Sequence, residues 1–194
     1  MFTMKDYLEN FIRSRVKSLN KREVQEILDI FHEKEFKKGE LFKKRDTRSE
    51  EVCFIIKGAT RTYQINNKGE EVTIFITQEN NFETDLVSIR TKEKTPIIIE
   101  FLADSLTLVA PVVKFTALLQ RNLTFNLLLR EYSEDRTVEL GKRHVMFLNG
   151  TAKERYQDII KNNPGLLKKF PLRYIASIIG VTPTQLSRIR NAKE

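Results

Sequence analysis

Residues 36–111 contain six short apolar or alternating runs separated by turn residues, and no other feature constrains the fold as strongly. Asn67, Lys68 and Gly69 predict a tight hairpin turn, and the Lys57–Gly58 pair predicts another bend. Short strands at regular spacing, without helices between them, predict an antiparallel sandwich or jelly roll of about 75 residues. The runs are LFKKR, VCFIIKG, ATRTYQI, EVTIFI, PIIIEFLA and SLTLVAP.

Segments whose apolar residues have helical spacing lie on both sides of this β-rich segment. Apolar residues at positions 7, 8, 11 and 12 and at 24, 27, 28 and 31 predict two short amphipathic helices, the second with Asn20 as its cap and Glu23 three residues later. Residues 114–148 contain no proline and a single glycine, so we expect a long helix or a short helix followed by a long one. Its interrupted apolar surface favours pairing with a second copy of the chain; the alternative is packing back onto the barrel.

A helix break divides the last part of the chain from the rest. Asn149 and Gly150 are expected to end the long helix, and Thr151 with Glu154 predicts a capping box for the next one. We therefore predict an α+β protein in three parts. These are an N-terminal antiparallel β jelly roll with flanking helices (1–115), a dimerisation helix (116–149) and a small all-α helix-turn-helix domain (150–194).

The excess of basic side chains lies at the C-terminal end. The 194-residue chain has 34 Lys and Arg against 26 Asp and Glu, whereas residues 151–194 carry nine basic and three acidic side chains. This asymmetry predicts a polyanionic partner, either nucleic acid or an anionic membrane surface. Because no long cationic amphipathic helix with bulky aromatics occurs, we expect nucleic acid and no membrane. Without an apolar run of 18 residues or a signal peptide, we expect a cytoplasmic protein.

The sequence offers little for metal or catalytic chemistry. Cys53 is the single cysteine, so neither a disulfide within the chain nor a multi-thiolate metal centre is expected, and its apolar run predicts a buried strand residue. His32 and His144 lack a metal-ligand partner at i+4, so we expect no metal and no cofactor. No nucleophilic constellation, Gly-rich phosphate loop or HExxH sequence occurs, so we predict that the chain is not an enzyme.

Residues 170–191 divide into two short helices around a compact turn. Four apolar residues share one face of the first helix, Gly180 suits a close bend, and Thr182 and Pro183 suit the cap and first position of the second helix. This spacing predicts a helix-turn-helix; an ordinary antiparallel helical hairpin is the alternative. The apolar residues are Leu172, Ile175, Ala176 and Ile179.

The second helix carries side chains that bind base edges and phosphates in DNA. We predict that the contacts come from Thr182, Thr184, Gln185, Ser187, Arg188 and Arg190. Cations nearby would hold the phosphate backbone. They are Lys168, Lys169, Arg173 and Lys193.

With these motifs in place, the chain resembles the Crp/Fnr family of bacterial transcription regulators over nearly its full length. The resemblance implies a cyclic-nucleotide-binding-type jelly roll, a homodimer with two recognition helices in successive major grooves of double-stranded DNA, and RNA polymerase as a further partner. The carrying segments are FKKGELFKKRD, VCFIIKGATRTY, NFETDLVSIRTKEKTPIIIEFLADS, TAKERYQDII and PLRYIASIIGVTPTQLSRIR. The last two look like the branch of the family common in Bacteroidetes.

The resemblance also implies what differs from the best-known members. The connection 162–170 is too short for their β-ribbon wing. Their base-contacting positions fall on Pro183, Thr184 and Arg188, with Gln185 beside them. Because only Arg188 keeps the family residue type, we expect a different operator sequence.

The effector pocket that the resemblance implies is degenerate. Where cyclic-nucleotide binders carry Gly-Glu-Leu and then Arg-Ser/Thr-Ala, this chain has Thr84-Asp85-Leu86 and Lys94-Thr95-Pro96. A shorter carboxylate, a lysine in place of the planar guanidinium and a proline without an amide proton weaken phosphate binding. We therefore expect no binding of cAMP, and an unknown or absent small-molecule effector. The alternative to a regulator is a ligand-binding or protein-interaction module of this fold without DNA binding.

Overall fold

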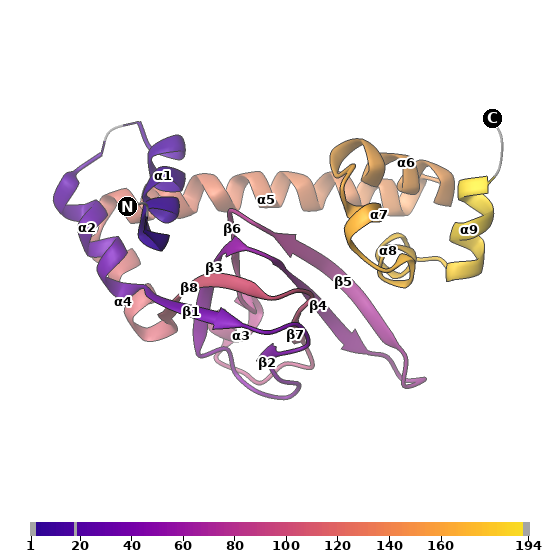
Figure 1. Cartoon of the computed structure of the whole chain (residues 1–194), viewed down its shortest axis with the longest axis horizontal. Coiled ribbons are helices and arrows are strands. Elements are labelled where there is room, and N and C mark those ends of the chain that lie inside the picture. Colours follow the sequence, from indigo (N-terminus) through magenta and orange to yellow (C-terminus); the bar gives the residue numbers. More distant parts are fainter. Residues whose placement is uncertain (1–2, 18, 192–194) are drawn as a thin grey trace.

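The computed structural model describes residues 3–17 and 19–191. A β-barrel lies beneath the long helix α5, with α1, α2 and α4 at one end of that helix and the helices α6 to α9 at the other (Figure 1). The predicted α+β class with antiparallel sheets and a long helix is confirmed.

The barrel consists of two four-stranded antiparallel sheets. All six predicted runs form strands, and Gly69 has the positive φ of 80° expected in the β4–β5 turn. The first sheet has the order β1 (His32–Phe36), β8 (Ser105–Pro111), β3 (Glu51–Lys57) and β6 (Asn81–Glu83). The second has the order β2 (Leu41–Lys43), β7 (Ile98–Phe101), β4 (Ala59–Ile65) and β5 (Glu71–Gln78).

Three barrel elements differ from the expectation. Strands β1 and β6 were not predicted, because only one residue of each is buried and their pairing with β8 and β3 comes from backbone hydrogen bonds rather than an apolar run. The expectation of no helix between the strands was wrong, since α3 (Leu86–Thr91) lies between β6 and β7. Its cap is Asp85, whose side chain accepts a hydrogen bond from Ser88 N.

The helices around α5 form one packed cluster with the first sheet. Of the two predicted alternatives for residues 114–148, the short helix followed by a long one is observed. Asn20 caps α2 as predicted, but Glu23 instead accepts a hydrogen bond from Thr124 Oγ1 at 2.6 Å at the start of α5, and this contact lowers the pKa of Glu23. The helices are α1 (Met4–Arg15), α2 (Lys21–Ile30), α4 (Val112–Arg121) and α5 (Leu123–Asn149).

Two apolar clusters stabilise this part of the chain. The larger one joins α1, α2, α4 and the first turns of α5 to the barrel, with Phe54, Phe125 and Leu128 fully buried in it. The predicted boundary at 115/116 therefore lies inside α4, which packs with the N-terminal helices. The smaller cluster fills the barrel and contains Cys53, which is buried as predicted; burial raises the pKa of its thiol.

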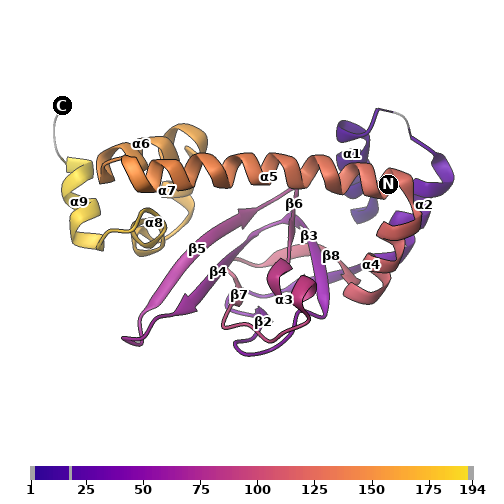
Figure 2. The ribbon, with the colours of Figure 1, turned by 180° about the vertical axis from the view of Figure 1, so that it is seen from behind.

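Four helices follow α5 and share a separate apolar cluster that includes Leu166, Ile175 and Leu186. Thr151 and Glu154 form the predicted capping box, with Glu154 N donating to Thr151 Oγ1 at 3.2 Å. Seen from behind, the β4–β5 hairpin extends from the barrel toward α8 (Figure 2). The helices are α6 (Ala152–Asn162), α7 (Leu166–Lys169), α8 (Leu172–Ile179) and α9 (Pro183–Asn191).

Candidate nucleic-acid interface and effector pocket

The turn between α8 and α9 is fixed by local hydrogen bonds and by α5. Gly180 has φ of 71°, and a Cβ atom at this position would lie 2.5 Å from the Phe147 ring of α5, so both the backbone and the packing require glycine. Gln185 N donates to Thr182 Oγ1 at 3.2 Å, and Thr182 N donates to Gln185 Oε1 at 2.9 Å. This capping box engages the Gln185 side chain, which was also predicted to contact DNA.

One face of α9 is buried and the other is exposed. Leu186 is fully buried against α8, whereas Val181 and Ile189 are half-buried. Within the described residues, Thr184, Ser187, Arg188 and Arg190 make no side-chain hydrogen bond or ion pair. The exposed residues of α9 and its cap are Thr182, Pro183, Thr184, Gln185, Ser187, Arg188, Arg190 and Asn191.

The predicted phosphate-binding cations lie on neighbouring elements. Lys168 and Lys169 are exposed on α7, and Arg173 is exposed on α8. Arg173 also donates to Tyr174 Oη at 3.2 Å. Lys193 lies outside the described residues.

Helix α8 is held against the barrel by contacts that the sequence did not indicate. Thr73 N, on the edge strand β5, donates to Ser177 Oγ at 2.7 Å. The buried Arg61 of β4 lies between two rings, with its Cζ 3.9 Å from the Tyr63 centroid and 4.2 Å from that of Tyr174. Arg61 stands in an alternating strand run, and alternation alone gives no sign that a cation there pairs with an aromatic residue 113 positions later.

The predicted effector pocket is closed by its own side chains. Lys43 Nζ lies 3.3 Å from Asp85 Oδ2 and donates to Thr95 Oγ1 at 3.0 Å, and the Lys43 and Asp85 side chains are 2% and 3% exposed. Thr95 Oγ1 also donates to Asp85. Thr84 donates to Glu51 O at 3.1 Å, whereas Leu86 and Lys94 are exposed. The carboxylate that would contact a ligand is thus paired with Lys43, a buried lysine that is not among the predicted pocket residues.

A second buried carboxylate, Glu83, lies on the neighbouring strand β6. Its Oε2 accepts a hydrogen bond from Thr60 Oγ1 at 2.6 Å, and burial raises its pKa above the ordinary value. Across the residues that the structure describes, no three His, Cys, Asp or Glu side chains gather as a metal site. No described helix is both long enough and apolar enough to cross a bilayer.

Known proteins match this chain in structure but not in sequence. No family model matches it, and no curated protein matches it. A mutant of CooA from Carboxydothermus hydrogenoformans is 18% identical, with a TM-score of 0.68 over 85% of this chain and 77% of that chain. A putative transcriptional regulator of the Crp/Fnr family from Eubacterium rectale is 15% identical, with a TM-score of 0.68 over 88% and 82% of the two chains.

A putative cAMP-binding regulatory protein from Silicibacter pomeroyi is also similar, at 16% identity and a TM-score of 0.64 over 95% of this chain and 86% of that chain. At such identities the likeness shows a shared fold. The chain therefore shares the fold of these three proteins.

Proposed function

We propose that this protein is a DNA-binding transcription regulator of the Crp/Fnr type, a homodimer that places two copies of α9 in successive major grooves. The observation that carries the proposal is the exposed polar face of α9 opposite the buried Leu186. Arginine, serine and threonine side chains of α9 that have no partner within residues 3–17 and 19–191 are free for base edges and phosphates. The nine basic against three acidic side chains of residues 151–194 match a polyanionic partner.

The dimer would form along the outer face of α5. Val138, Gly141, Val145 and Leu148 follow the 3-4-3 spacing of a coiled-coil seam. Val138, Val145 and Leu148 are 55%, 57% and 69% exposed in the single chain. A second copy of the same helix would cover them, and this favours pairing over the alternative of packing back onto the barrel.

Sedimentation of Val145→Glu tests the dimer. A carboxylate in the seam has no partner and would repel its symmetry mate, so we expect a monomer at micromolar concentration where the wild type is a dimer. Val113→Glu makes the same change on α4, where Val113 is 78% exposed, and should remain dimeric. A wild-type monomer would contradict the homodimer.

Selection of bound sequences from random duplex DNA, followed by salt titration of the best site, tests DNA binding. We expect log affinity to fall steeply and linearly with log salt, because each neutralised phosphate releases counterions. A flat salt response or no enriched sequence would favour the alternative, a ligand-binding or protein-interaction module without DNA binding. The proposal also includes several finer expectations. These are an unknown or absent small-molecule effector, contact with RNA polymerase, membership of the Bacteroidetes-like branch, a cytoplasmic location and no enzymatic activity.

A further inference from the structure

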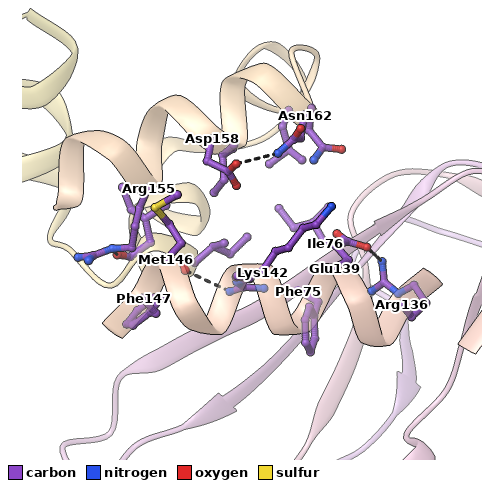
Figure 3. Close-up of a pocket in the computed structure, with 16 residues that line it drawn as sticks. Phe75, Ile76, Arg136, Glu139, Lys142, Met146, Phe147, Arg155, Asp158 and Asn162 are labelled. Carbon is purple, nitrogen blue, oxygen red and sulfur yellow. Dashed lines mark hydrogen bonds and ion pairs between the residues drawn. The ribbon is translucent and has the colours of Figure 1, made fainter. Parts of the chain in front are cut away.

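A cleft of about 410 Å³ lies where the barrel meets the C-terminal helices. Its walls come from β5, α5, α6 and α8, and Figure 3 shows side chains from these elements around one space. Phe75 and Ile76 of β5 and Ile159 of α6 give it apolar surface. The volume falls within the range of about 300 to 1,000 Å³ that is typical of small-molecule pockets.

The polar lining of the cleft is mainly cationic, with four basic side chains against the two carboxylates of Glu139 and Asp158. Two of the cations are already engaged: Arg136 pairs with Glu139 at 2.7 Å, and Arg155 donates to two backbone carbonyls. The other two are Lys142 and Arg143.

Lys142 and Arg143 lack a carboxylate partner among the described residues. Lys142 extends from α5 into the space between α5 and α6 (Figure 3). Arg143 donates to the carbonyl of Ile178 at 3.1 Å and lies over the Phe75 ring. Burial lowers the pKa of Arg143, and the charge of Glu139 only partly offsets this effect. An anion between these two cations would offset that unfavourable burial.

We propose that this cleft binds a small anionic molecule with an apolar body. Lys142 and Arg143 hold its charged group, and Phe75, Ile76 and Ile159 contact the rest. Because β5 belongs to the barrel while α6 and α8 carry α9, such a ligand bridges the sensor to the recognition helix. This regulatory consequence rests on the proposed function; the binding itself does not.

Titration of the full-length protein with 8-anilinonaphthalene-1-sulfonate, a fluorescent aromatic sulfonate, tests the site. We expect saturable binding of one molecule per chain. Lys142→Gln should weaken it about 5- to 30-fold because a charge-assisted hydrogen bond is lost. Asp158→Asn should tighten it about 2- to 5-fold because it removes one of the two carboxylates of the lining. Lys114→Gln, an exposed lysine on α4, is the matched control and should bind as the wild type does.

Two outcomes would overturn the site: no saturable binding, or binding that Lys142→Gln and Asp158→Asn leave unchanged, as expected if the dye settles on the exposed face of α5. Because no DNA is present, this result is independent of the regulator assignment. A chain that binds DNA without a Lys142-dependent dye site refutes the cleft alone. A chain with that dye site and no DNA affinity refutes only the proposed function.

Discussion

Polar groups at the two predicted sites differ in what they contact. In the barrel, Asp85, Thr95 and Lys43 bind one another and are buried. On α9, Thr184 and Arg188 face solvent. Both sites were predicted from residue types at motif positions. The comparison teaches that residue type alone does not show whether a polar group is free for a ligand; burial and partners decide it.

The barrel network supports the expectation that a nucleotide phosphate binds poorly. A phosphate in a buried pocket is favoured by an unpaired cation beside it, but the buried Lys43 is paired with Asp85 at 3.3 Å, and Lys94 is exposed at the surface instead of buried beside them. A ligand would have to break this buried pair, which costs several kcal/mol. The proposed contact of the α9 face with DNA requires no such disruption.

We expect the largest effect, a loss of stability, from removal of the buried Lys43. Lys43→Met leaves the Asp85 carboxylate without its cation and should lower the free energy of unfolding by about 3 to 5 kcal/mol, as urea denaturation would measure. Lys44→Met, at the exposed neighbouring position, should change it by less than about 0.5 kcal/mol.

The double variant Lys43→Met with Asp85→Asn sharpens this test. It removes both charges, and the amide oxygen of the introduced asparagine can still cap α3, so most of the lost stability should return. If Lys43→Met alone is as stable as the wild type, the barrel pair is not the closed network described above.

Arg188→Ala gives the next largest effect, on affinity rather than stability. It should weaken binding to the best selected duplex by about 1 to 3 kcal/mol in fluorescence anisotropy, while the free energy of unfolding stays within about 0.5 kcal/mol because Arg188 is exposed. Arg48→Ala, at an exposed barrel position, is the matched control. Unchanged affinity would remove Arg188 from the interface and erase the contrast between the two sites.

The barrel strands and the long helix were predictable because their apolar residues repeat with a clear period. The same rule missed β1 and α3, since HEKEF buries only Phe36 and LVSIRT buries only Ser88. In both segments backbone pairing or a cap, rather than an apolar face, fixes the element.

The residues of the two candidate sites were predicted less completely than the fold. Exposure of the α9 side chains followed from one helical period, which also places Leu186 inward. The partners of Asp85 could not follow from any local pattern, because Lys43 lies 42 residues earlier and meets Asp85 only when β2 joins its sheet. The same holds for Arg61 and Tyr174, which come together through the docking of α8 on the β4–β5 hairpin.

We expect the smallest effect from Glu83→Gln, which should change how the free energy of unfolding depends on pH. Burial raises the pKa of Glu83 in the folded state, so the native protein holds this proton more tightly than the unfolded chain. The contribution of Glu83 to stability is therefore fully present below its unfolded pKa of about 4.3, and it is lost as pH rises through its raised folded pKa. Replacing it with a neutral amide, which can still accept from Thr60, removes this loss.

The free energy of unfolding of Glu83→Gln relative to the wild type should consequently increase from about pH 4.3 upward and then level off, as urea titrations at several pH values would measure. Glu93→Gln removes a carboxylate from an exposed position and serves as the control. A relative stability that falls with rising pH would mean that Glu83 is held as a favourable anion.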